Sequence, residues 1–375
     1  MYKQYCGCAY PNLLRFVLSA CLALTVYLTW PLWESREYPP LLPFFNAPQI
    51  NFNFLLLSSC ITTLVIPRVG VALCWFVFLS SMCLDQTRMQ PQIFSMLMLM
   101  LGTIGSSSGV LISRSSLVSQ YIFAGLHKLV SPGYYTSFTS WIFGTTLSQP
   151  CYLFISICFA LSELAIGLGC LFPKFRKVSM FSAVLLHSGT LITLSPLFKN
   201  WNSAVWPWNF ALLFATPCLV TSWQGKGFGN VWLDAGRWTK AWACSLILMP
   251  AGYYLGITDA NLSSCLYSYN TPKAFICTAF NKQNLSDISY EYLNVPLPPA
   301  RRLFYPFFSA VGRSGTWLQV DDPRWFFGGQ WKTQWDDIEK SPIEEIVIPV
   351  IGNTTTILKL DSLNNEQELE LKPTP

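Results

Sequence analysis

The chain has 375 residues, of which 52% are hydrophobic and only 11% are charged. Soluble globular domains carry about 25% charged residues, so this composition indicates a protein that lies in a lipid bilayer. The net charge of +5 comes from basic residues beside apolar segments and not from one basic patch, which argues against nucleic-acid binding.

Nine apolar segments are predicted to cross the membrane, since a spanning helix needs about 20 mostly apolar residues. In chain order they are 12–30, 52–66, 69–84, 93–112, 117–130, 151–172, 178–196, 204–221 and 241–257. Segment 117–130 is short, and a broken helix packed inside the bundle is the alternative for it. The aromatic segment 131–144 predicts an element at the membrane surface. The expected fold is an all-α polytopic membrane bundle of about nine transmembrane helices.

The acidic residues divide the chain in two. Five of the 19 precede residue 258 and fourteen follow it. We therefore expect a transmembrane helical domain over 1–257 and a soluble domain over 258–375 with a frayed tail. Within the second domain, β-branched runs on both sides of Gly352-Asn353 predict a β-hairpin. Cys265 and Cys277 could form a disulfide there if that side of the membrane is oxidising.

Basic residues in short loops predict the orientation of the bundle. The densest cluster is Lys174, Arg176 and Lys177, followed by Lys226, Arg237 and Lys240. With nine spans these loops lie on the side of the N-terminus, together with Arg68 and Arg114. That side is expected to be cytoplasmic, which places the C-terminal domain in the periplasm, a lumen or the exterior. The first span then acts as an uncleaved start signal.

Ionisable side chains inside hydrocarbon are costly, and four of them are candidate functional residues here. Both histidines, His127 and His187, fall in predicted spans, together with Lys128 and Glu163. Each has a structural alternative. Lys128 could extend to the lipid headgroups, Glu163 could be a protonated hydrogen-bonding carboxyl, and His187 could bond only to neighbouring helices.

Other polar residues are expected to be structural. Asp85 and Arg88 begin a loop and predict an exposed ion pair. The Trp-rich run 201–209 is typical of an interfacial aromatic belt, with Asn202 and Asn209 as candidates to face a cavity. Most cysteines are scattered singly and none has metal-ligand spacing, so no metal site is predicted.

Four motifs in order resemble a known family. They are LDQTRMQPQIF (84–94), QYIFAGLHKL (120–129), ALSELAIGLGCLFPKFRKV (160–178) and VLLHSGTLITL (184–194). Together they are similar to the vitamin K-dependent gamma-carboxylase and its bacterial relatives, the horizontally transferred transmembrane (HTTM) family. The resemblance implies a bundle of about nine helices with an extracytoplasmic C-terminal region. It also implies that Lys128 is the base that deprotonates a reduced quinone. The carboxylase has a catalytic histidine in its aspartate-led loop, where this chain has Gln92, which cannot exchange a proton.

Two hypotheses for the function follow. The first is a membrane enzyme that binds a lipophilic cofactor or substrate, with Lys128 as base and His187, Glu163 and His127 orienting the reacting group. The second is a non-catalytic membrane subunit that docks membrane or secreted protein partners, or assists maturation of a secreted peptide. Convergence of Lys128, Glu163 and His187 on one cavity would favour the first.

Overall fold

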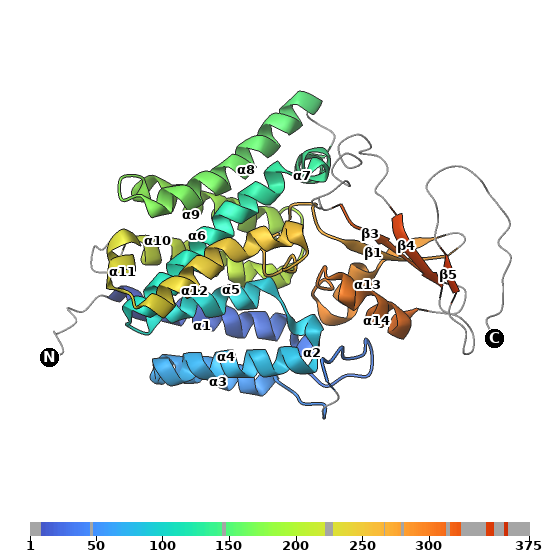
Figure 1. Cartoon of the computed structure of the whole chain (residues 1–375), viewed down its shortest axis with the longest axis horizontal. Coiled ribbons are helices and arrows are strands. Elements are labelled where there is room, and N and C mark those ends of the chain that lie inside the picture. Colours follow the sequence, from blue (N-terminus) through green and yellow to red (C-terminus); the bar gives the residue numbers. More distant parts are fainter. Residues whose placement is uncertain are drawn as a thin grey trace.

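The computed structural model describes residues 9–45, 48–144, 148–221, 228–265, 267–278, 281–312 and 316–323, and the backbone of 343–348 and 356–358. A bundle of helices forms one part and a small sheet with two helices lies at one end of it (Figure 1). The bundle helices are α1 (Ala9–Leu28), α2 (Trp30–Trp33), α3 (Asn53–Val65), α4 (Pro67–Leu84), α5 (Pro91–Met100), α6 (Ser107–Leu129), α7 (Pro132–Phe143), α8 (Gln149–Leu171), α9 (Arg176–Leu194), α10 (Trp206–Thr221), α11 (Phe228–Asp234) and α12 (Arg237–Leu248). Short 3₁₀ helices are η1 (Gln86–Arg88), η2 (Leu101–Thr103), η3 (Ser203–Val205) and η4 (Met249–Leu255).

Five of the described helical stretches are long and apolar enough to cross a membrane. They are Pro11–Leu28, Pro67–Leu84, Gln149–Leu171, Arg176–Leu194 and Ser203–Val220. Each coincides with a span predicted from the sequence, so the apolar helical bundle is confirmed. Two further apolar helices, Asn53–Val65 and Pro91–Thr103, are shorter. The count of nine spans stays a prediction.

The predicted boundary between 112 and 117 is wrong. The chain turns at Gly105, whose φ of 77° lies in the left-handed region, and α6 then runs unbroken from Ser107 to Leu129. The Ser106 hydroxyl caps this helix by accepting from the Gly109 N–H at 3.0 Å. Ser113, in the predicted gap between two spans, is buried inside the helix and donates to the Met98 carbonyl at 2.7 Å. Hydrogen bonds of this kind make buried serine acceptable in an apolar bundle.

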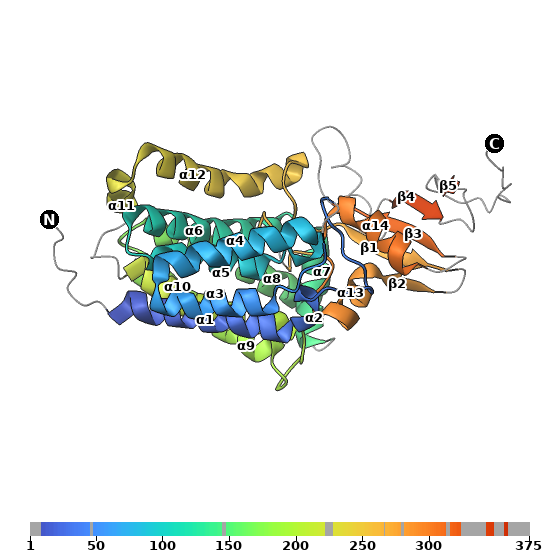
Figure 2. The ribbon, with the colours of Figure 1, turned by 90° about the horizontal axis from the view of Figure 1, so that it is seen from below.

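Arg114 also lies inside α6 and not in a loop. It is buried, and its Nε donates to the Leu219 carbonyl in α10 at 2.6 Å. Of the other predicted basic residues, Lys226 lies outside the described residues, and two begin helices. Arg176 begins α9 and Arg237 begins α12, and both of these helix ends lie near the N-terminal end of the bundle in Figures 1 and 2.

The aromatic segment 131–144 forms α7, which is viewed nearly end-on in Figure 1. It therefore lies across the direction of α6 and α8, which it connects. This geometry suits an element at the end of a bundle.

The C-terminal unit is an antiparallel sheet with two helices packed on it. The strands β1 (Lys273–Cys277), β2 (Lys282–Asn284), β3 (Trp317–Asp321), β4 (Ile343–Ile348) and β5 (Thr356–Leu358) lie in the order β2-β1-β3-β4-β5. Helices α13 (Leu285–Leu293) and α14 (Arg301–Val311) contribute to its core. Ile276 pairs with Leu318, and both pack with Phe307 of α14. The predicted hairpin is confirmed in its strands, where Ile346 pairs with Leu358; its turn lies outside the described residues.

This unit is packed against the bundle. Leu293 and Val295 belong to the main apolar core of the bundle. Between them, Asn294 adopts a left-handed φ of 55° and donates from Nδ2 to the Leu28 carbonyl at 2.6 Å. Asn tolerates this conformation better than most residues. Residues beyond 258 are thus positioned to contribute to a site in the bundle.

Asp85 and Arg88 are not an exposed pair, because both side chains are fully buried. The Asp85 carboxylate lies 2.6 Å from Arg36 and accepts from the Thr87 hydroxyl at 2.7 Å. Arg88 donates to the Leu32 carbonyl at 2.8 Å. The sequence prediction of an exposed pair was wrong because Arg36, remote in the chain, supplies the countercharge that makes burial tolerable.

Helices α6 and α8 approach closely through two glycines. A Cβ atom on Gly125 would lie 2.6 Å from the Ala160 carbonyl oxygen, and one on Gly167 would lie 2.9 Å from the Ile122 nitrogen. Small residues of this kind allow close helix packing in membranes. Contact at this distance brings side chains of α6 within reach of side chains of α8.

Gly125→Ala is expected to destabilise the protein by about 1–3 kcal/mol, because the added methyl group forces α6 away from α8. Thermal unfolding in detergent micelles measures the effect. Gly189→Ala in α9 is the matched control, since nothing lies within 4 Å of its Cβ position. Equal unfolding temperatures for the two variants would contradict the role of the close contact.

Candidate functional site

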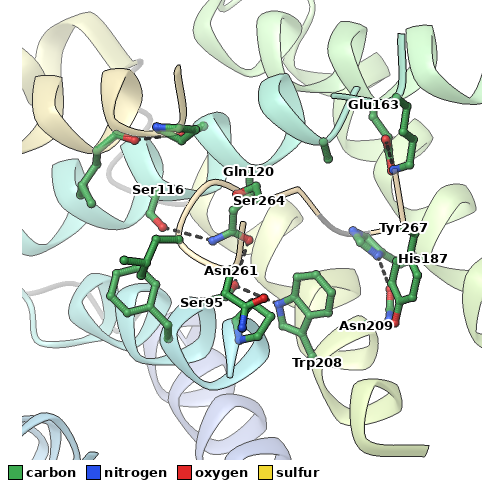
Figure 3. A pocket seen from close by; sticks show the side chains of 18 of the residues that line it. Ser95, Ser116, Gln120, Glu163, His187, Trp208, Asn209, Asn261, Ser264 and Tyr267 are labelled. Atoms are coloured by element: carbon green, nitrogen blue, oxygen red, sulfur yellow. Dashed lines mark hydrogen bonds and ion pairs between the residues drawn. The ribbon is translucent and has the colours of Figure 1, made fainter. Parts of the chain in front are cut away.

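A partly open cavity of about 110 Å³ lies in the bundle, close to the C-terminal unit. Its walls come from α5, α6, α8, α9, α10, α12, η4 and the segment after η4 (Figure 3). Apolar lining residues are Phe94, Leu186, Leu246, Met249 and Leu262. An apolar lining interrupted by polar groups is typical of small-molecule sites.

Lys128 and Glu163 line this cavity as an ion pair. The Lys128 Nζ lies 2.5 Å from the Glu163 Oε2, and the two side chains are 7% and 16% exposed. Glu163 therefore has a cationic partner on the neighbouring helix, and Lys128 directs its ammonium to that helix. This geometry favours a paired site over a lysine extended to the headgroups and over an isolated protonated carboxyl.

His187 also lines the cavity, but both of its ring nitrogens are engaged. Nδ1 lies 3.0 Å from the Asn209 Oδ1, and Nε2 lies 2.7 Å from the Tyr121 hydroxyl. The Asn209 Nδ2 donates to the Val205 carbonyl, which orients the amide so that Oδ1 accepts from Nδ1–H. In the neutral ring, Nε2 then accepts from Tyr121, which also contacts the Thr216 hydroxyl at 2.8 Å. His187 is thus held as an element of the wall by α6 and α10.

His127 does not line the cavity. It is fully buried on another face of α6, as expected for consecutive helical residues that point about 100° apart. Its Nε2 donates to the Ser263 carbonyl at 2.8 Å, and its Nδ1 lies 2.6 Å from the Tyr254 hydroxyl. The sequence grouped His127 with Lys128, whereas the structure directs it to the segment that covers the cavity.

That segment belongs to the predicted soluble domain, and sequence analysis assigned it no role in the site. Asn261, Ser264 and Tyr267 line the cavity from this side, and the Asn261 Nδ2 donates to the Met89 carbonyl at 2.8 Å. Ser264 and Tyr267 have left-handed φ values of 57° and 53°. Burial raises the pKa of the Tyr267 phenol, so its hydroxyl stays neutral.

Gln92 and the Trp-rich run 201–209 were also singled out in the sequence, and only the run contributes to the cavity wall. Gln92 is buried in α5 but is not among the residues that line the cavity. Asn202 is buried and donates to the Tyr267 hydroxyl at 3.4 Å, whereas Trp201 is 40% exposed. The run 201–209 thus contributes an exposed aromatic residue at one end and Asn209, a wall residue, at the other.

Sequence analysis missed a neutral polar wall formed by Ser95, Ser116, Gln120 and Trp208, which lies on α5, α6 and α10. A signal for part of it existed. Ser116, Gln120, Ala124 and Lys128 recur every four residues, which places them on one face of a helix. The break predicted before residue 117 hid this pattern.

Metal and disulfide chemistry find no support within the described ranges. No group of three or more His, Cys, Asp or Glu side chains there is placed to hold a metal ion. Cys265 and Cys277 are not joined by a disulfide. The Cys265 Sγ contacts the Ser268 hydroxyl, whereas the Cys277 Sγ contacts the side-chain amide oxygen Oε1 of Gln319.

No protein-family model, curated protein or solved structure matches the chain. The resemblance to the carboxylase family therefore remains a prediction from the four motifs. What the site can do is argued below from its own geometry.

Lys128→Met is expected to destabilise the protein by about 3 kcal/mol, because it leaves the Glu163 carboxylate without its countercharge. Adding Glu163→Gln should restore part of this loss. Unfolding of the two single variants and the double variant in micelles gives a coupling energy, expected to exceed about 1 kcal/mol. Strict additivity of the two single effects would contradict an ion pair that matters for folding.

Proposed function

We propose that the chain is a multi-pass integral membrane protein whose bundle binds a lipophilic molecule with a weakly acidic hydroxyl, and that Lys128 and Glu163 remove the hydroxyl proton. The observation that supports this most is the location of the ion pair in the wall of a largely apolar cavity. Such a cavity accepts an apolar body and presents charge at one point only.

The proton transfer balances within the pair. The Lys128 ammonium gives a proton to the Glu163 carboxylate, leaving a neutral amine and a neutral carboxyl. The amine then takes the hydroxyl proton and becomes an ammonium beside the new oxyanion. The low dielectric of the cavity strengthens the final attraction between the ammonium and the oxyanion.

The chemistry of the lining suits a reduced quinone, the cofactor that the family resemblance implies. The wall residues Phe94, Leu186 and Leu246 suit an apolar ring, and Lys128 suits an acidic hydroxyl. Such a group would supply the acidic hydroxyl. Carboxylation is not part of the proposal, because Gln92 lies outside the cavity and has no proton to exchange.

The proposed orientation has the N-terminus in the cytoplasm and the C-terminal unit on the opposite side. Support comes from the basic residues that begin α9 and α12, Arg176, Lys177 and Arg237. These helix ends lie toward the N-terminal end of the bundle, whereas the sheet lies at the other end (Figures 1 and 2). Basic short segments stay in the cytoplasm.

Protein purified in native lipids is expected to retain a lipophilic hydroxyl compound, and Lys128→Met should reduce its amount at least about tenfold, the loss that follows when a charge-assisted contact of about 1.5–3 kcal/mol is removed. Mass spectrometry of the organic extract, normalised to protein, measures it. Lys177→Met is the control, since Lys177 is an exposed lysine at the start of α9. An empty bundle that copurifies with a stoichiometric protein partner would overturn the proposal in favour of an accessory subunit.

A further inference from the structure

The cavity has two polar ends on one face of α6. Lys128 is at one end and Gln120 and Ser116 are at the other, with Ala124 between them. Eight residues separate Lys128 from Gln120, which is about 12 Å along a helix with a rise of about 1.5 Å per residue. Figure 3 shows Glu163 on one side of the cavity and Ser95, Ser116 and Gln120 together on another. The small Ala124 side chain leaves room between the two ends.

The far end is a chain of neutral hydrogen bonds. The Trp208 Nε1 donates to the Ser95 hydroxyl at 2.9 Å, and that hydroxyl donates to the Gln120 Oε1 at 2.8 Å. The Gln120 Nε2 in turn donates to the Ser116 hydroxyl oxygen at 3.1 Å. Three helices, α5, α6 and α10, therefore fix the orientation of the Gln120 amide.

Two donor protons of this chain are left unused. An amide nitrogen has two protons and a hydroxyl has one. After the bonds above, one Gln120 amide proton and the Ser116 hydroxyl proton have no acceptor among the described residues. Both groups line the cavity. Both protons can be donated to a ligand oxygen that accepts hydrogen bonds.

We propose that the Ser95–Gln120–Ser116 wall is a second subsite, at which Gln120 and Ser116 donate to an acceptor oxygen of the ligand. The ligand then has two oxygens on opposite sides of an apolar middle, an acidic hydroxyl at Lys128 and an ether or carbonyl oxygen at Gln120. Gln120 is the residue that determines specificity for the second oxygen. This inference rests on the proposed function, because it concerns the same cavity.

Two aromatic probes test the subsite without knowledge of the natural ligand. The first, 1-naphthol, has the acidic hydroxyl alone, and the second, 4-methoxy-1-naphthol, adds an acceptor oxygen across the ring. Their binding to the full chain in lipid nanodiscs can be measured by titration calorimetry. We expect the methoxy probe to bind about fivefold to tenfold more tightly, the gain from one net hydrogen bond.

Gln120→Leu should reduce this ratio to about one, and Ser116→Ala, which is a smaller change, should reduce it in part. Gln92→Leu is the matched control, a buried glutamine in the neighbouring helix α5 that does not line the cavity, and it should retain the ratio. Lys128→Met should weaken both probes and leave their ratio unchanged. Ala124→Leu should weaken both probes, because it fills the middle of the site.

The outcomes separate the two proposals. Equal affinity of the two probes in the unchanged protein, with both affinities lowered by Lys128→Met, would overturn the subsite and retain the proposed function. A ratio that persists in Gln120→Leu would overturn the assignment to Gln120. Failure of both probes to bind, or binding unaffected by Lys128→Met, would overturn the proposed function itself.

Discussion

An ammonium and a carboxylate inside an apolar bundle are tolerated only if they meet, and much of the bundle geometry follows from the pair Lys128 and Glu163. The two lie on different helices, so α6 and α8 must come within the length of a lysine side chain. Gly125 and Gly167 permit this, because a Cβ atom at either position would collide with the facing helix. The close packing of the helices and the 2.5 Å contact between the charges are thus one arrangement. The cavity opens beside it, where the pair is only partly covered.

The same requirement for partners explains which parts of the fold could be predicted. Helices α8 and α9 consist largely of apolar residues, and their sequence predicted them well. The prediction for residues 105–129 was wrong, because Arg114 was interpreted as a loop residue and a boundary was placed between 112 and 117. Ser113 and Arg114 are buried there, and their partners are carbonyl groups of α5 and α10. A pattern of residue types along one segment does not contain the positions of acceptors on other segments.

The residues of the candidate site also divide into those that the sequence predicted and those that it did not. Lys128, Glu163 and His187 were predicted from the cost of placing ionisable groups in lipid, and all three line one cavity. The neutral residues Gln120 and Ser95 carry no such cost and gave no comparable signal. Asn261 and its neighbours were unpredictable for another reason. They follow the last predicted span, and only the packing of the C-terminal unit on the bundle brings them over the cavity.

Helix α6 determines both the chemistry of the cavity and its cover, through two consecutive residues. Lys128 points into the cavity, whereas His127 points to the covering segment and donates to the Ser263 carbonyl. A carbonyl oxygen only accepts, so the Nε2 proton is assigned, and in the neutral ring Nδ1 accepts from the Tyr254 hydroxyl. The cover is therefore attached to the same rigid element that holds the base. Any rotation of α6 that moved Lys128 relative to Glu163 would also displace Ser263, so the position of the cover and the position of the ion pair are mechanically linked.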